Sequence, residues 1–261
     1  MSAGTTPPAT PPAAPTLDLA PWPQIDFSVY GPVETLKLPR VQKIVSATMA
    51  RNWVMIPHVT HHEEADITDL EALRRQMAET TGKKVTPLAF MMKASVAALK
   101  AMPRFNSSIG PDGVSLILKK YYHIGFAVDT PNGLLVPVIR DVDRKSVVDI
   151  AAEIAETSTQ ARTKGLPLNR MEGGSFTLSS LGSVGGTGFT PIINAPEVAI
   201  MGSTRSFEKP VKLNGELAWR TMLPLSLSYD HRVINGADAA RFCLEFAKAL
   251  AQPAALVEAS A

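Results

Sequence analysis

The sequence predicts an α/β domain with a mixed β-sheet, and two observations support this prediction. Segments with the alternating pattern of β-strands are interleaved with segments that have the 3.6-residue periodicity of amphipathic helices. Turn signals such as Asn132-Gly133 join some strands directly, whereas helices separate others, so we expect both antiparallel and parallel pairs. With 261 residues, of which 45% are hydrophobic, the chain is long enough to enclose a core.

Charge and hydropathy exclude several classes of protein. The formal net charge of +2, from 26 basic and 24 acidic residues, provides no overall field for nucleic acid or for an anionic membrane. No apolar run approaches the ~20 residues that span a bilayer, and the lack of Lys or Arg before Lys37 argues against a signal peptide. We therefore expect a cytoplasmic protein. Cys243, the single cysteine, lies on the apolar stripe of the last predicted helix and should be a core residue.

Composition divides the chain into a tail and a domain. Residues 1–24 consist mainly of Ala, Pro and Thr and hold seven of the 21 prolines. Such a segment buries too little apolar surface to fold, so we expect a disordered tail or linker. Residues 25–261 are expected to form one domain.

The domain begins with a predicted helix, residues 36–53, and a predicted strand, residues 56–67. The strand contains three histidines and two glutamates, which raises the question of a metal site. Alternation allows only His58, His62 and Glu64 to share a face, and this spacing does not match the ligand geometry of zinc. We therefore expect no metal and interpret the strand as solvated or as the edge of a pocket.

Two further helices follow. Residues 68–80 open with Thr68 and Glu71 in the Thr-x-x-Glu pattern of a capping box, and Gly82 provides a stop. Residues 87–102 are apolar on nearly every side, which predicts a buried helix.

The remaining elements are predicted from similar patterns. Gly182, Gly185 and Gly186 lie in a glycine-rich loop but do not form a G-x-G-x-x-G motif, so a dinucleotide site is not supported. The predicted elements are a polar loop at 104–108, two β-rich runs within 116–140 joined by a hairpin at 129–133, a helix at 146–163, strands at 175–178 and 198–201, and a hairpin turn at 213–216.

One stretch near the C-terminus combines a strand, a sharp break and a helix. Residues 223–230 alternate between apolar side chains and Pro, Ser or Asp, which is typical of a half-buried strand. Asn235-Gly236 break the pattern, and Asn235 followed by Asp238 predicts the start of a helix. His231 therefore lies in the strand-to-helix connection. Imidazole suits proton transfer near neutral pH, although a single histidine beside Asp and Arg is, from the local sequence alone, more often a structural, hydrogen-bonded residue.

The segment SLSYDHRVING, residues 226–236, resembles the active-site signature of dihydrolipoamide acyltransferases, the second component of 2-oxo acid dehydrogenase complexes. The resemblance covers roughly residues 25 to 250 and looks greatest for the acetyl-transferring members of pyruvate dehydrogenase complexes. The other motifs, in the order of that family, are RNWVMIPHVT, MPRFNSSIG, HIGFAVDTPNGLLVPVIR and FTLSSLGSVGGTGFTPIINAPEVAIMG.

This resemblance implies a fold, a reaction and the residues that carry it out. The fold would be the two-layer, mixed-sheet sandwich of chloramphenicol acetyltransferase, in which trimers place active sites between neighbouring subunits. The reaction would transfer an acyl group, here acetyl, between dihydrolipoamide and coenzyme A. His231 would be the general base for the attacking thiol, and Ser179 would donate a hydrogen bond to the oxyanion. Asn235 would be the third catalytic residue. It stands where many members have Asp, so an ion pair with an arginine such as Arg40 is not expected.

The resemblance also implies partners. Coenzyme A would be a substrate, and the lipoyl group would come from another domain or chain, because no lipoyl sequence precedes residues 1–24. The decarboxylase and dihydrolipoamide dehydrogenase components would bind, and no metal or redox cofactor is needed because one thioester replaces another.

The alternative is a non-catalytic core component that only binds partner subunits; such components tend to lack the histidine present here as His231. Asn106 is either a turn residue or, from the resemblance, a neighbour of the cofactor channel.

The C-terminal residues predict the size of the assembly. In the resembled family, apolar residues after the last helix commonly dock onto a neighbouring trimer and build a larger core. Here Pro253 interrupts the last helix, and only Leu256 and Val257 remain as anchors. We therefore expect a homotrimer rather than a core of about 24 subunits.

Overall fold

The structure, a computed structural model, describes residues 20–131 and 133–258. Most of the predicted tail, residues 1–24, lies outside the described residues, as does Asn132 of the predicted hairpin. Within the described ranges, no helix is long and apolar enough to cross a membrane. The elements, in chain order, are η1 (Phe27–Tyr30), α1 (Arg40–Met55), β1 (His58–Asp66), α2 (Thr68–Thr81), α3 (Pro87–Ala101), η2 (Pro103–Phe105), β2 (Ser107–Ile109), β3 (Leu116–Leu118), β4 (Ile124–Phe126), β5 (Val128–Thr130), β6 (Gly133–Leu135), β7 (Val138–Ile139), η3 (Val142–Arg144), α4 (Val147–Thr163), η4 (Leu168–Arg170), β8 (Phe176–Ser180), β9 (Ala199–Ser203), β10 (Phe207–Leu213), β11 (Glu216–Asp230), α5 (Gly236–Ala251) and α6 (Pro253–Glu258).

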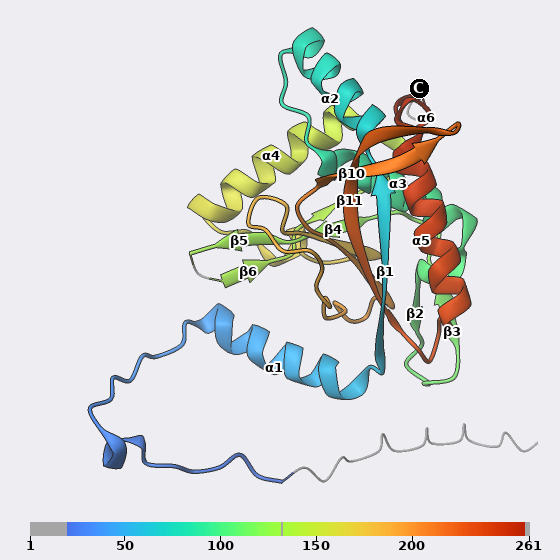
Figure 1. Cartoon of the computed structure of the whole chain (residues 1–261). Coiled ribbons are helices and arrows are strands. Elements are labelled where there is room, and N and C mark those ends of the chain that lie inside the picture. Colours follow the sequence, from blue (N-terminus) through green and yellow to red (C-terminus); the bar gives the residue numbers. More distant parts are fainter. Residues whose placement is uncertain (1–19, 132, 259–261) are drawn as a thin grey trace, which may run out of the picture.

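A seven-stranded mixed sheet forms the centre of the domain (Figure 1). Its order is β1-β11-β9-β8-β4-β7, and β10 pairs with β11 at one end. The neighbours β4, β8 and β9 run parallel, and the other pairs are antiparallel. The parallel β4 and β8 are connected through α4, as a parallel pair requires a crossover. The prediction of a mixed α/β sheet is confirmed.

Helices α3, α4 and α5 cover one face of this sheet (Figure 1). Phe90 of α3 and Phe242 of α5 are fully buried and join Leu225 and Leu227 of β11 in one hydrophobic cluster. Ten of the fifteen residues of α3 are buried, which confirms the prediction from its apolar sequence. Burial of these side chains supplies most of the favourable free energy of the fold.

The prediction that β11 is half-buried is wrong. Ser226, Ser228 and Asp230, on the face opposite the helices, are at most 2% exposed. The segment that includes Gly188 and Phe189 covers this face, since Gly188 approaches Ser226 and Phe189 lies against Gly202. The alternating polar side chains of β11 therefore form a buried, hydrogen-bonded face and not a solvated one.

The start of α2 also differs from its prediction. Thr68 and Glu71 do not form a capping box, because Glu71 pairs with Arg74 and the Thr68 side chain makes no cap bond to the helix. Instead, Asp66 Oδ1 accepts hydrogen bonds from the Thr68 backbone N–H (3.0 Å) and hydroxyl (2.7 Å). The stop at Gly82 is confirmed, with φ of 64° at the C-cap.

Two boundaries elsewhere differ from the prediction. Helix α1 begins only after Pro39, and the predicted loop at 104–108 contains η2 and part of β2. Asn106 is buried there, and its Nδ2 donates to the carbonyls of Lys119 and Tyr121 (both 3.0 Å), which makes it a structural turn residue.

At the C-terminus, Leu256 is 6% exposed and belongs to the core of its own chain, so it is not available as an intersubunit anchor.

Candidate active site

His231 is the first residue after β11, and two backbone hydrogen bonds fix the turn that carries it. Its N–H donates to the Pro57 carbonyl (3.1 Å), just before β1. The preceding N–H, of Asp230, donates to the Val198 carbonyl (2.9 Å), just before β9. The imidazole itself is exposed in the single chain. The structure therefore holds the backbone of His231 rigidly and leaves its ring accessible, as a catalytic base requires.

An internal ion pair braces the same turn. Arg232 donates from Nε to Asp230 Oδ1 (3.0 Å) and from Nη2 to Oδ2 (2.7 Å), a two-point contact with a carboxylate that is 2% exposed. The hydrogen bonds to Asp230 raise the pKa of Arg232. Asp230 and Arg232 therefore brace the turn that carries His231.

Asn235 caps the helix that follows. Its Oδ1 accepts a hydrogen bond from the Asp238 N–H (2.9 Å), and its Nδ2 donates to Asp238 Oδ2 (2.9 Å). The helix start predicted from these two residues is confirmed. Both polar atoms of the Asn235 side chain form hydrogen bonds with Asp238, so Asn235 orients the turn. The catalytic role predicted for it stays a prediction.

Ser179 is half-buried near the end of β8 and lies far from His231 of the same chain. Gly202 of β9 pairs with Ser179 on one side and with Ser226 of β11 on the other, and Ser226 precedes His231 by five residues. Two strand spacings of about 4.8 Å and five residues of about 3.3 Å separate the pair by roughly 19 Å. One chain therefore does not bring the predicted base and oxyanion donor together.

A cavity of about 650 Å³ opens beside the end of β8. Ser180, next to Ser179, lines it together with Lys84, Arg162 and Arg205. Thr204 also lines it, is 2% exposed, and has a hydroxyl oxygen without a hydrogen-bond partner among the described residues. A buried, unpartnered hydroxyl facing a cavity with basic residues fits a polar, anionic ligand. Sequence reasoning missed this site, because its cationic side chains come from separate segments and form no motif.

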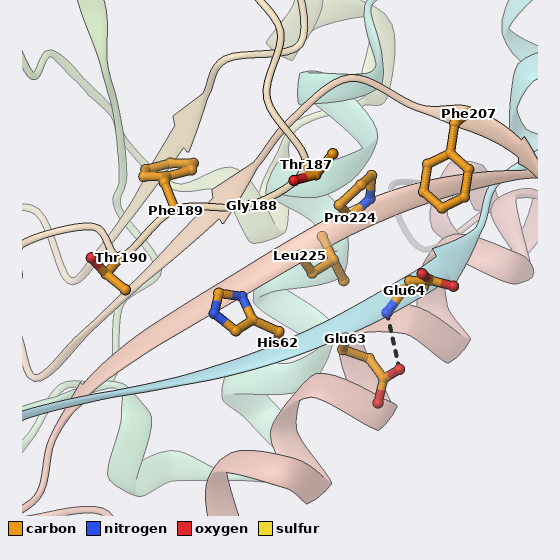
Figure 2. A pocket seen from close by; sticks show the side chains of 10 residues that line it. All are labelled: His62, Glu63, Glu64, Thr187, Gly188, Phe189, Thr190, Phe207, Pro224 and Leu225. Atoms are coloured by element: carbon orange, nitrogen blue, oxygen red, sulfur yellow. Dashed lines mark hydrogen bonds between the residues drawn. The ribbon is translucent and has the colours of Figure 1, made fainter.

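A second cavity, of about 730 Å³, lies between β1, β11 and the 187–190 segment. Figure 2 shows the lining of this cavity, with His62 and Glu64 on β1 and Phe189 on the 187–190 segment. The Ser226 hydroxyl lies 3.0 Å from His62 Nδ1.

Two histidines of β1, His58 and His62, take part in structural hydrogen bonds. His58 Nε2 accepts from the Ile193 N–H (3.0 Å), so Nδ1 is the donor to the Ile56 carbonyl (2.8 Å). Among the residues that the structure describes, no group of three or more His, Cys, Asp or Glu side chains is arranged to hold a metal ion.

Cys243 is fully buried on α5, which confirms its predicted place in the core. Burial raises the pKa of its thiol to about 12. The thiolate is therefore not populated at neutral pH, and Cys243 does not serve as a nucleophile.

The family model described as 2-oxoacid dehydrogenases acyltransferase (catalytic domain) matches residues 30–258. The chain belongs to this family. It is 58% identical over 238 residues to the dihydrolipoyllysine-residue acetyltransferase component of the pyruvate dehydrogenase complex of Cupriavidus necator, covering 90% of this chain. It is 52% identical over 246 residues to the component of the same name from Haemophilus influenzae, covering 92% of this chain. The chain spans 43% of the length of each of these relatives.

Solved structures of this acyltransferase family have the same fold. Dihydrolipoamide acetyltransferase of Azotobacter vinelandii, 52% identical, superimposes with a TM-score of 0.87 over 91% of this chain and 99% of that one. That structure was determined to investigate the role of a serine, a histidine and an asparagine in its catalytic mechanism. The cubic core of a pyruvate dehydrogenase multienzyme complex gives the same TM-score, identity and coverage. Chloramphenicol acetyltransferase, 16% identical, has a TM-score of 0.51 over 77% of this chain and 94% of its own, which confirms the predicted fold.

Proposed function

We propose that this chain is the catalytic domain of an acyltransferase that moves an acetyl group between dihydrolipoamide and coenzyme A. The observation that carries the proposal is the exposed imidazole of His231 on a turn held by two backbone hydrogen bonds, in a chain of this family. Acetyl is proposed because the relatives reported above are acetyltransferase components.

In the proposed reaction, the thiol of coenzyme A attacks the thioester carbonyl of acetyl-dihydrolipoamide. His231 accepts the thiol proton as the carbon–sulfur bond forms. The carbonyl oxygen gains the negative charge, and the Ser179 hydroxyl donates a hydrogen bond to it. The intermediate then expels the dihydrolipoamide sulfur, which takes the proton back from His231. One thioester is broken and one is formed, so the balance needs no oxidant or reductant.

This mechanism requires an oligomer, because a base and an oxyanion donor must both lie within about 3 Å of the reacting groups. The separation of roughly 19 Å within one chain follows from the strand register. We propose a homotrimer in which His231 of one subunit faces Ser179 of the next. Support comes from α1, in which Asn52 is the one buried residue while Ile44 and Trp53 are more than half exposed. Such apolar surface is expected to be covered by another subunit.

We propose that coenzyme A enters through the 650 Å³ cavity beside Ser179. Its phosphates would pair with Lys84, Arg162 and Arg205, and the unpartnered hydroxyl of Thr204 would bond to a polar group of the ligand. The lipoyl group, carried by another domain or chain, would approach from the other side. The decarboxylase and dihydrolipoamide dehydrogenase components stay proposed partners, and the cytoplasmic location stays a prediction.

A steady-state assay tests the proposal. The purified protein is given dihydrolipoamide with acetyl-, succinyl- or isobutyryl-coenzyme A, and the acyl-dihydrolipoamide formed is measured by chromatography. We expect acetyl-coenzyme A to be the best donor. The His231→Ala variant, with unchanged gel-filtration volume, serves as the control. A protein that binds partners but transfers none of these groups would be the non-catalytic core component instead.

A further inference from the structure

Two segments support the turn that carries His231, and they come from distant parts of the chain. The Pro57 carbonyl, just before β1, accepts the hydrogen bond from the His231 N–H (3.1 Å). The Val198 carbonyl, just before β9, accepts the hydrogen bond from the Asp230 N–H (2.9 Å). The position of His231 therefore depends on how firmly these two segments are held relative to each other.

The segment that ends at Val198 has little regular structure. Residues 189–197 belong to no helix or strand, so the hydrogen bonds of a sheet do not fix their backbone. Apolar packing is also limited here, because Ile193 forms a cluster of only three buried residues with Ile56 and Ile200, separate from the main core. Polar contacts must therefore supply part of the attachment of this segment.

Ile193 is the residue at which the segment is attached. Its N–H donates to His58 Nε2 (3.0 Å), and its carbonyl accepts from Asn52 Nδ2 (2.9 Å) and from the Ala195 N–H (3.2 Å). Ile193 is fully buried and Asn52 is 1% exposed, so these bonds are shielded from water. Two side chains, one from the end of α1 and one from the start of β1, therefore hold both backbone groups of one residue in the other segment.

The His58 ring also fixes the segment that contains Pro57. Because Nε2 accepts from Ile193, the ring proton lies on Nδ1, which donates to the Ile56 carbonyl (2.8 Å). Ile56 and His58 flank Pro57, whose carbonyl supports the turn. The indole of Trp53 stacks on the His58 ring, with centroids 5.6 Å apart. One imidazole thus contacts both supports of the turn.

We propose that His58 is a positioning residue for the acyl-transfer reaction, which fixes the location of His231 by joining the two segments that support its turn. Nε2 connects the segment of Ile193 and Val198 to β1, and Nδ1 connects β1 to the end of α1. Without this acceptor the buried Ile193 N–H loses its partner, the segment shifts, and the imidazole of His231 moves away from the thiol that it deprotonates. The proposal rests on the proposed function, because its effect is on the orientation of the base.

The test compares kcat and the KM for coenzyme A in two variants of this residue. His58→Leu fills the space without an acceptor, whereas His58→Gln offers an amide oxygen to the Ile193 N–H. We expect His58→Leu to lower kcat about tenfold with an unchanged KM, because the base is displaced and the coenzyme A cavity is not. His58→Gln should recover most of this loss. His61→Leu is the matched control, since His61 lies opposite Leu227 on the other face of the same strand and should keep wild-type kcat.

Hydrogen exchange, followed by mass spectrometry of the peptide that contains the turn, reports on its support without any reaction. In His58→Leu the amides of Asp230 and His231 should exchange at least about tenfold faster than in the wild type. His58→Gln and His61→Leu should exchange at nearly the wild-type rate.

Wild-type kcat or wild-type exchange in a folded His58→Leu variant would overturn the proposal, and so would an increase in KM alone. Equal losses in His58→Leu and His58→Gln would overturn it too, because they would assign the effect to the ring that stacks on Trp53 and not to the acceptor. If His58→Leu does not fold, Asn52→Ala, which removes the other side-chain bond to Ile193, must lower kcat and speed exchange, and wild-type values there would overturn the proposal.

Absence of acetyl transfer by the wild type would instead refute the proposed function. The exchange rates then decide the role of His58 by themselves. Faster exchange of the turn in His58→Leu would still support the connection between the two segments, and an unchanged rate would overturn it.

Discussion

Two inactive variants should restore activity to each other when their subunits are mixed. His231→Ala removes the base and leaves Ser179 intact, and Ser179→Ala does the reverse. The separation of roughly 19 Å between these residues excludes a site within one chain. In the proposed trimer, each site therefore takes its base from one subunit and its oxyanion donor from the next.

The size of the recovery follows from this arrangement. In trimers assembled at random from equal amounts of the two variants, half of the bases and half of the oxyanion donors are intact. About one quarter of the sites would then contain both groups, so the mixture should show about one quarter of the wild-type kcat. Each variant alone should retain less than about one hundredth of it.

Co-expression with two different affinity tags isolates the mixed trimers, in which one site of the three contains both groups, so their kcat should be about one third of the wild-type value. Acetyl transfer is measured for these trimers, for each pure variant, and for a mixture of the pure variants that were never allowed to exchange subunits. Mixed trimers that stay as inactive as the pure variants would refute the intersubunit site. Recovery in the unexchanged mixture would show that subunits dissociate during the assay.

The other predictions concern single changes. His231→Ala should lower kcat at least about 100-fold with an unchanged circular dichroism spectrum, and wild-type kcat in this variant would exclude His231 as the base. Ser179→Ala should lower kcat with little change in the KM for coenzyme A, because its hydroxyl acts in the transition state; an effect on KM alone would assign it to binding. Because the pKa of Glu197 is raised from 4.5 to about 7, its contribution to the free energy of unfolding is largest below pH 4.5 and is lost as the pH rises through about 7, by up to about 3 kcal/mol. Glu197→Gln should flatten this dependence in urea titrations, and an unchanged dependence would contradict it. Light scattering at micromolar concentration should give a mass near three chains, since Leu256 is buried in its own subunit; a mass near that of a cubic core would show that other residues dock the trimers.

The sequence predicted the region around His231 well because its signals are local. The break at Asn235-Gly236 and the spacing to Asp238 predicted the helix start, and the structure has that cap. Most helices and strands were also predicted within a few residues, since periodicity depends on neighbours in the sequence. The capping box at Thr68 failed because Asp66 accepts from the Thr68 N–H and the Ile67 carbonyl accepts from the Glu71 N–H. A pattern does not show which of two competing acceptors is used.

The distance between Ser179 and His231 could not be predicted from the same signals. It depends on the order β11-β9-β8 in the sheet and on the register of two pairs of strands, neither of which periodicity specifies. The burial of the polar face of β11 was missed for a related reason. The segment that covers Ser226 and Ser228 is irregular and glycine-rich, so it gave no sign that it packs on the sheet.

Glu197 shows what a family motif leaves undetermined. Its neighbours in the sequence, Pro196 and Val198, gave no reason to expect a buried carboxyl, because charged residues are seldom buried. The structure places it where Gly174 leaves room for Oε1. A carboxyl retained at such a cost is expected to affect the groups that face it. Lys119 opposes that cost, because its positive charge lowers the pKa of the carboxyl against the effect of burial.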